Sequence, residues 1–184
     1  MAIAYYIQTK KKGNTVSNLS STRALSDVTH KHGGQYIASA VGEVNVVNAM
    51  KANKAIIGGE GNGGVIVPEL HYGRDAMAGI AIFLSLLAEK QMSMSALKST
   101  YPAYEIIKDK LELTPESDVA DIFSKIKKTF ANERINETDG LKIDFEAGWV
   151  HMRLSNTEPI VRIYCEAGDP ETALMLINKV KSVI

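Results

Sequence analysis

Apolar and polar positions follow two different patterns along this chain of 184 residues. In the first part, short apolar runs alternate with segments whose apolar residues recur every three or four positions. The apolar runs predict strands at residues 15–19, 35–41, 55–57 and 65–67, and the other segments predict helices at 2–12, 22–33, 44–50 and 75–90. Strands that alternate with helices predict a mixed-sheet α/β/α domain over residues 1–100. The last helix is apolar on most sides, so we expect it to be buried.

A different pattern begins at Tyr101-Pro102, which marks a linker. Strict apolar/polar alternation predicts strands that have one buried face, at residues 106–113, 141–145, 150–154 and 161–165. Helical spacing after Thr114-Pro115 and after Asp169-Pro170 predicts two helices. The order of these elements predicts an α+β domain over residues 101–184, with a small four-stranded antiparallel sheet and both helices on one face.

Composition narrows the possible partners. The 21 Lys and Arg residues balance the 21 Asp and Glu residues, and this balance argues against a nucleic-acid or anionic-membrane partner. No apolar run approaches the ~20 residues that span a bilayer. The one cysteine, Cys165, has no partner for an internal disulfide, which favours a cytoplasmic protein.

Residues 153–159, Arg-Leu-Ser-Asn-Thr-Glu-Pro, connect two of the predicted strands. They bring a guanidinium, two hydroxyls and a carboxamide together, and such a loop can surround an anion with fixed donors and one permanent charge. Pro159 fixes φ and keeps the preceding residue out of the helical region. The pattern indicates a phosphate-binding turn.

The second informative segment, residues 58–64, has five glycines in seven positions. Glycine lets the backbone approach a ligand closely and adopt positive φ. The only side chains, Glu60 and Asn62, accept and donate hydrogen bonds and therefore suit the vicinal hydroxyls of a sugar. The segment lacks Gly-Lys-Ser/Thr and precedes a strand, so it is neither a Walker loop nor a dinucleotide fingerprint. A flexible hairpin turn is the alternative interpretation.

Four ordered segments together resemble the α-D-phosphohexomutases. The glycine-rich segment, followed by Pro-Glu-Leu-His-Tyr-Gly-Arg-Asp-Ala at 68–76, resembles the sugar-binding segment of that family. Residues 20–25 and 41–45 match its third domain in order and spacing, and residues 153–159 resemble the phosphate-binding loop of its fourth domain. The resemblance covers almost the whole chain and is strongest to the phosphoglucosamine mutase and phosphomannomutase/phosphoglucomutase branch. Gly64 departs from the pattern, since several members have histidine there.

The resemblance implies an isomerase that interconverts the 1-phosphate and 6-phosphate of glucosamine, mannose or glucose through a phosphoserine and a bisphosphate intermediate. The family's phosphoserine loop and Mg²⁺ loop lie in its first two domains, and neither pattern occurs in this sequence. We therefore interpret the chain as a C-terminal fragment, domains three and four, that is inactive alone. Its Mg²⁺ would bind to the missing N-terminal domains of the same protein. We expect no catalytic residue, metal site or bound cofactor in the fragment itself.

On this resemblance the ligand is a hexose phosphate, and the two turns bind opposite ends of it. The predicted phosphate-binding residues are Arg153, Ser155, Asn156, Thr157 and Arg162. Arg162 is alternatively a solvated strand arginine.

The predicted sugar-binding residues are Glu60, Asn62 and Glu43. Glu43 alternatively stabilises a helix N-terminus, and Arg74 and Asp75 are interpreted as an internal ion pair or N-cap. The alternative function for the whole chain is a stand-alone sugar-phosphate-binding or regulatory module without catalysis.

Overall fold

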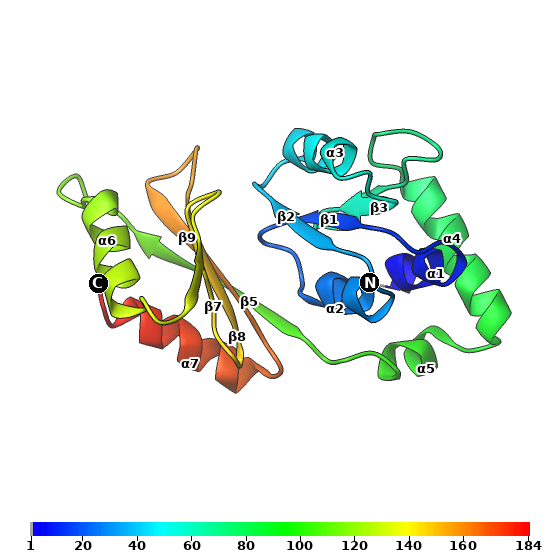
Figure 1. The fold of residues 1–184 in the computed structure, drawn as a ribbon. Coiled ribbons are helices and arrows are strands. Elements are labelled where there is room, and N and C mark those ends of the chain that lie inside the picture. The colour runs from blue at the N-terminus through cyan, green and yellow to red at the C-terminus, as the bar shows by residue number, and fades with distance from the viewer. Residues whose placement is uncertain (1) are drawn as a thin grey trace. The chain divides into compact units, whose positions relative to one another are not determined.

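The computed structural model describes residues 2–184, which divide after Pro102 into two compact units (Figure 1). Residue 1, where the first predicted domain begins, lies outside the described residues. The predicted domain boundary, between residues 100 and 101, lies two residues before this division.

The first unit contains a four-stranded mixed sheet in the order β2-β1-β3-β4. Its strands are β1 (Thr15–Asn18), β2 (Tyr36–Ser39), β3 (Ile57–Gly59) and β4 (Val65–Ile66). Its helices are α1 (Ala2–Lys10), α2 (Ala24–Lys31), α3 (Glu43–Ala52), α4 (Ala76–Lys90) and α5 (Met94–Ser99). The first three strands are parallel, whereas β4 is antiparallel to β3. The predicted α/β fold with a mixed sheet is confirmed.

Helices cover both faces of this sheet, with α3 on one face and α2 on the other (Figure 1). The chain moves from β1 to the neighbouring β2 and then back past β1 to β3. Because crossovers between parallel strands are right-handed, two crossovers that run in opposite directions place their helices on opposite faces. The core between α3 and the sheet contains Val16, Val46, Met50, Ala55 and Ile66.

Strand β3 differs from the sequence prediction, because it includes Gly58 and Gly59 rather than ending before them. A Cβ atom on Gly58 would lie 2.3 Å from Sδ of Met50, and one on Gly59 would lie 2.1 Å from the carbonyl oxygen of Gly64. These two glycines therefore let α3 and the following hairpin approach the strand. The true turn is shortened to residues 60–64.

The prediction that helix α4 is buried on all sides is wrong. Met77, Ile80 and Leu84 are 74%, 53% and 56% exposed, whereas Leu86 is 1% exposed. Only one side of the helix packs on the rest of the unit, mainly on α1. The sequence pattern did not reveal this, because apolar residues occupy the exposed side as well.

The second unit contains a five-stranded antiparallel sheet in the order β5-β9-β8-β7-β6. Its strands are β5 (Glu105–Glu112), β6 (Arg134–Asn136), β7 (Leu141–Asp144), β8 (Gly148–Leu154) and β9 (Ile160–Ala167). Its helices are α6 (Val119–Thr129) and α7 (Pro170–Lys181). The predicted α+β class is confirmed, but the sheet has one strand more than predicted. Strand β6 has three residues, too few to show alternation in the sequence.

Helices α6 and α7 share one core with the sheet, as predicted. The core contains alternate residues of the central strands, among them Ile143, Val150 and Ile163, together with Ile126 of α6 and Ile177 of α7. Alternation places the intervening residues on the opposite face of the sheet. That second face carries the charged side chains of the candidate phosphate site.

Helix α6 begins later than the predicted start at Thr114-Pro115. Asp118 is its N-cap, because Oδ1 accepts hydrogen bonds from the backbone N–H groups of Ala120 and Asp121 at 2.9 and 3.1 Å. Residues 114–117 form a turn instead, in which the Ser117 N–H donates to the Thr114 carbonyl oxygen.

Leu84 and Leu86 of α4 provide a test of its one-sided burial. We expect Leu86→Ala to lower the free energy of unfolding of the first unit by about 2–5 kcal/mol, because it opens a cavity. The matched Leu84→Ala change should alter it by less than about 0.5 kcal/mol. Urea denaturation followed by amide signals of the first unit measures both. Equal losses would show that both faces of α4 are packed.

Candidate functional site

The glycine-rich turn at residues 60–64 is closed by its own hydrogen bonds. The Glu60 N–H donates to the Gly64 carbonyl oxygen at 2.9 Å, and the Gly63 N–H donates to the Glu60 carbonyl oxygen at 3.1 Å. Gly63 has a φ of 100°, which disfavours other residues. Asn62 Oδ1 accepts from the Gly64 N–H at 3.3 Å. The turn is therefore a defined hairpin connection that presents two polar side chains.

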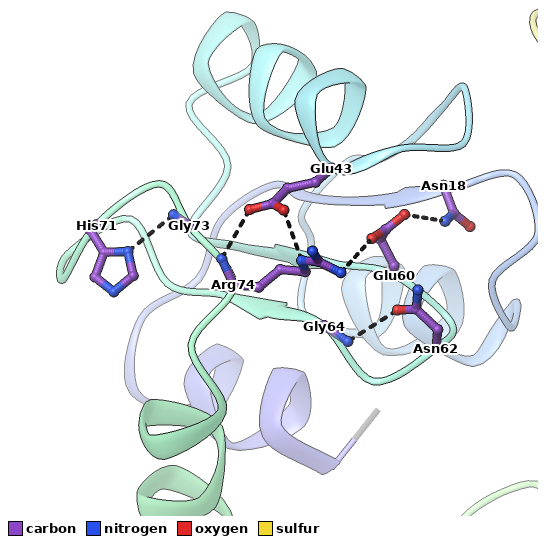
Figure 2. A network of polar contacts seen from close by, with 8 residues as sticks. All are labelled: Asn18, Glu43, Glu60, Asn62, Gly64, His71, Gly73 and Arg74. Atoms are coloured by element: carbon purple, nitrogen blue, oxygen red, sulfur yellow. Dashed lines mark hydrogen bonds and ion pairs between the residues drawn. The ribbon is translucent and has the colours of Figure 1, made fainter.

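The Glu60 carboxylate is almost enclosed, with its side chain 6% exposed. Asn18, the last residue of β1, donates from Nδ2 to Glu60 Oε1 at 3.1 Å. Asn18 is held in turn by Ser21, whose hydroxyl donates to Asn18 Oδ1 at 2.8 Å. Nη1 of Arg74 lies 3.7 Å from Glu60 Oε2. Figure 2 shows this carboxylate between the amide and the guanidinium.

The same guanidinium also contacts Glu43, the first residue of α3. Arg74 Nε donates to Glu43 Oε2 at 2.8 Å, and the backbone N–H of Arg74 donates to Glu43 Oε1 at 3.2 Å (Figure 2). Arg74 thus forms an ion pair, but its partner is Glu43 and its side chain is half exposed, so the pair is not the internal one that was predicted. The structure thus brings together the predicted sugar-binding residues Glu43, Glu60 and Asn62 with Arg74.

Asp75 is the N-cap of α4, as its alternative interpretation predicted. Its Oδ1 accepts from the Ala78 N–H at 2.9 Å, and its Oδ2 lies 3.0 Å from Nε2 of His71. The Ala78 N–H first and His71 second lower the pKa of the Asp75 carboxyl. The loop that carries Arg74 is therefore anchored at the start of a helix.

Two depressions adjoin the glycine-rich turn, and both are lined by Gly63 and Gly64. One, of about 330 Å³, also contains Ser17, Ser21 and Glu60. The other is shallower, has about 480 Å³, and contains Glu43, Gly73, Arg74 and Asp75. Backbone and polar groups of this turn thus line two depressions that a small molecule could enter.

The candidate phosphate site centres on two arginines of neighbouring strands. Arg153 of β8 lies directly opposite Arg162 of β9 in the sheet register, so their side chains share one face. Like charges in this arrangement repel each other. Each arginine has a carboxylate partner, at 3.4 Å for Arg153 Nε and Asp139 and at 2.7 Å for Arg162 Nη2 and Glu158. Arg162 thus lies beside Arg153 and forms an ion pair with Glu158.

The loop between these strands provides the neutral polar groups. The backbone N–H of Ser155 donates to the Ile160 carbonyl oxygen at 2.9 Å. The Ser155 hydroxyl lies 3.4 Å from both Arg162 Nη2 and the Thr157 N–H. Asn156 and Thr157 are exposed at the end of the loop. The five predicted phosphate-binding residues therefore belong to one loop and its two flanking strand positions.

The predicted sugar-binding and phosphate-binding groups belong to different units of the chain. That they bind opposite ends of one ligand stays a prediction.

The sequence analysis missed three residues that lie beside the predicted sugar-binding and phosphate-binding residues. Asn18 holds Glu60, Asp139 pairs with Arg153, and Lys110 of β5 lies opposite Arg162 in the register. Lys110, Arg162 and Arg153 thus form one row of cations across three strands, and Lys110 pairs with Glu112 at 3.0 Å. Only the strand register reveals that Lys110 belongs to this row, because Lys110 is distant in sequence from the two arginines.

His151 supports the turn that carries Asp139. It is 2% exposed, and its Nε2 lies 2.7 Å from the Asp139 carbonyl oxygen. Because a carbonyl only accepts, Nε2 carries the proton and donates. Burial is the main cause that lowers the pKa of His151, and the Lys142 and Arg153 charges act in the same direction. Neutral His151 therefore helps to position the counter-ion of Arg153.

Cys165 is buried in β9. Burial first, and Glu166 second, raise the pKa of the Cys165 thiol to about 12, so it stays protonated. Among residues 2–184 no group of three or more His, Cys, Asp and Glu side chains could hold a metal ion. No helix of the described chain combines the length and apolar content that a bilayer crossing requires.

Two models of known protein families match this chain. The model of the phosphoglucomutase/phosphomannomutase alpha/beta/alpha domain III matches residues 1–104, and the model of the C-terminal domain of the same family matches residues 110–181. The chain belongs to the phosphoglucomutase/phosphomannomutase family. The resemblance inferred from its sequence motifs is thereby confirmed.

Two curated relatives of this family are similar over most of the chain. A phosphoglucomutase/phosphomannomutase of Thermococcus kodakarensis is 35% identical over 163 residues, which cover 88% of this chain and 35% of the relative. A phosphoglucosamine/phosphogalactosamine mutase of Sulfurisphaera tokodaii is 32% identical over 171 residues, which cover 92% of this chain and 38% of the relative. The chain thus spans less than half the length of these phosphoglucomutase/phosphomannomutase relatives.

Two solved structures share the fold of this chain. A protein of Burkholderia thailandensis superposes with a TM-score of 0.79 at 21% identity, over 98% of this chain and 39% of the other. An N-acetylphosphoglucosamine mutase of Aspergillus fumigatus, solved with glucose 1,6-bisphosphate, superposes with a TM-score of 0.67 at 14% identity, over 99% of this chain and 42% of the other.

The lowered pKa of His151 generates a prediction about stability and pH. Between its folded-state pKa and the unfolded value of about 6.5, the unfolded chain binds more protons, so stability falls as pH decreases through this window. His151→Gln should flatten the pH dependence of the free energy of unfolding of the second unit below pH ~6.5. Urea titrations followed by the fluorescence of Trp149, the only tryptophan, measure this. Equal slopes for both proteins would contradict the prediction.

Proposed function

We propose that this chain is the substrate-binding C-terminal half of a phosphohexomutase, an isomerase that interconverts hexose 1-phosphate and hexose 6-phosphate. The proposed reaction passes through a phosphoserine and a bisphosphate intermediate. The family membership supports the reaction class. The observation that carries the binding role is the pair of arginines, Arg153 and Arg162, directly opposite each other beside a donor-rich loop.

The arginine pair favours an anionic ligand on electrostatic grounds. Two cations at directly opposite strand positions repel each other, and Asp139 and Glu158 each compensate one of them. A phosphate group would add negative charge that both guanidiniums could share, and it could accept paired hydrogen bonds from the planar Arg153 guanidinium. Ser155, Asn156 and Thr157 would add neutral donors. Lys110, at the end of the same cation row, would contribute a weaker and more distant attraction.

The carboxylate of Glu60 suits the sugar. It is nearly enclosed and held from both sides, so its oxygens can accept hydrogen bonds from hydroxyl groups without reorganisation of the side chain. Asn62 uses Oδ1 to close its own turn, and this contact does not engage its Nδ2 donor. Glu60 and Asn62 together would then recognise vicinal hydroxyls.

The comparisons support hexose phosphates as the ligand class. Structures of an Aspergillus fumigatus N-acetylphosphoglucosamine mutase are complexes with glucose 1,6-bisphosphate and with GlcNAc-6P and magnesium. The two relatives described above carry names that refer to glucose, mannose, glucosamine and galactosamine phosphates. The proposal is therefore for hexose phosphates as a class.

The phosphoserine of the proposed enzyme would belong to further domains, and so would its Mg²⁺. The candidate site offers cations, hydroxyls and carboxylates paired with arginine, and this set does not fit Mg²⁺. The residues described here would bind and orient the substrate in the cytoplasm, and we expect the chain alone to bind without turnover.

A binding titration tests the proposal directly. We expect glucose 6-phosphate, mannose 6-phosphate or glucosamine 6-phosphate to shift the backbone amide signals of residues 153–159 in the 184-residue chain. Galactitol, which has hydroxyls but no phosphate, is the matched control and should leave these signals in place. If none of the three hexose phosphates shifts them at millimolar concentration, this loop is not a phosphate site.

Substitution of Arg153 measures the charge contribution. Arg153→Ala removes a charge-assisted contact, which costs about 1.5–3 kcal/mol, or roughly a 10- to 150-fold rise in Kd. Arg153→Lys keeps the charge but loses the planar fork, so its Kd should lie between those of wild type and Arg153→Ala. Arg134→Ala, at an exposed position of β6, is the control and should bind like wild type. Calorimetry with inorganic phosphate and a hexose 6-phosphate measures each Kd, and a change below about threefold for Arg153→Ala would contradict the assignment.

A further inference from the structure

Arg74 connects two carboxylates that come from distant parts of the chain. We propose that Arg74 is a positioning residue that fixes Glu60 for sugar binding, and that Glu43 orients Arg74 instead of contacting the sugar. This inference rests on the proposed function, because it assumes that Glu60 accepts hydrogen bonds from the hexose. Figure 2 shows the line of contacts from Glu43 through Arg74 to Glu60.

Glu43 is occupied by Arg74 at both of its oxygens. Oε2 accepts from the side-chain Nε at 2.8 Å, and Oε1 accepts from the backbone N–H at 3.2 Å. The guanidinium is planar and rigid, so a fixed Nε also fixes the direction of the two Nη groups. Glu43 therefore aims the far end of Arg74, and a sugar hydroxyl would have to compete with a charge-assisted hydrogen bond to reach it.

Glu60 receives charge compensation from Arg74 without a direct hydrogen bond. A carboxylate that is 6% exposed needs a compensating charge or hydrogen bonds. Asn18 supplies a hydrogen bond to Oε1, and Nη1 of Arg74 lies 3.7 Å from Oε2. That distance is too long for a hydrogen bond. Arg74 thus stabilises the charge and leaves the lone pairs of Oε2 able to accept from a hydroxyl.

Gly64 makes room for this arrangement. A Cβ atom at residue 64 would lie 2.6 Å from Cδ and 3.1 Å from Cγ of Arg74. The stem of the arginine therefore runs against the bare backbone of the glycine-rich turn. Any larger residue at position 64 would have to displace Arg74. Such a substitution would leave every charged group in place.

A thermodynamic cycle tests the inference on the 184-residue chain. The ligands are inorganic phosphate and whichever of glucose, mannose and glucosamine 6-phosphate binds wild type most tightly. We expect Arg74→Gln and Glu60→Gln each to raise the Kd for the hexose phosphate at least ~5-fold and to change the Kd for inorganic phosphate less than ~2-fold. The double variant should bind about as well as Glu60→Gln alone, because residues that act through one another are not additive. Arg74→Lys should recover part of the loss.

Gly64→Ala provides a second variant that displaces Arg74 but keeps every charged group. We expect it to reproduce the selective loss of hexose phosphate binding. Gly168→Ala is the matched control, because a Cβ atom there has no heavy atom within 4 Å. Amide spectra of each variant test whether the fold is retained. If either Arg74→Gln or Gly64→Ala unfolds, the comparison uses the other variant.

The outcomes separate this inference from the proposed function. If wild type binds no hexose phosphate, both fall. If wild type binds but Arg74→Gln and Gly64→Ala bind equally well, only the role of Arg74 is overturned. Equal loss for inorganic phosphate in Arg74→Gln would mean that Arg74 binds phosphate itself, and multiplicative effects in the cycle would mean that it acts independently of Glu60. Either result overturns the inference.

Discussion

The pairing of arginine with carboxylate fixes the polar groups of both candidate sites. In the first unit one guanidinium serves two carboxylates, Glu43 and Glu60, so the cluster keeps an excess of acceptors. In the second unit two arginines lie at directly opposite strand positions, and each has its own carboxylate partner. The Arg162–Glu158 pair is exposed, and such pairs contribute little to stability, typically below ~1 kcal/mol. The main effect of the ion pairs in both sites is to orient the arginine side chains, because they hold these long side chains in defined directions in the absence of a ligand.

Backbone geometry makes this orientation possible. Gly58 and Gly59 allow β3 to pack closely on α3 and on its own hairpin, and Gly64 leaves space for the stem of Arg74. The close packing brings the first residue of α3 and the loop before α4 to the same glycine-rich turn. Gly64 departs from the family pattern, in which several members have histidine. In this structure the space that a side chain at position 64 would need is occupied by Arg74.

The sequence predicted those features that depend on local pattern. Alternation identified the long strands β5, β8 and β9, and the spacing of glycines and donors identified both turns. It missed β6, which is too short to alternate, and it misjudged α4, whose exposed side is as apolar as its buried side. It also assigned Glu43 to the sugar or to a helix end without its Arg74 contact, and it overlooked Lys110 beside Arg162. Those relations depend on strand register and loop packing between residues 30 or more positions apart, which no local pattern encodes.

The two candidate sites differ in a way that the proposed reaction requires. A mutase must bind a hexose phosphate in two orientations, so one group of contacts should be strict and the other tolerant. Phosphate is the constant feature of both orientations, and the rigid forks of Arg153 and Arg162 suit a constant partner. The hydroxyls change places, and a carboxylate accepts hydrogen bonds at two equivalent oxygens from several directions. On this proposal Arg74 would preserve the tolerance because, at 3.7 Å, it compensates the charge of Glu60 without occupying an acceptor site on Oε2.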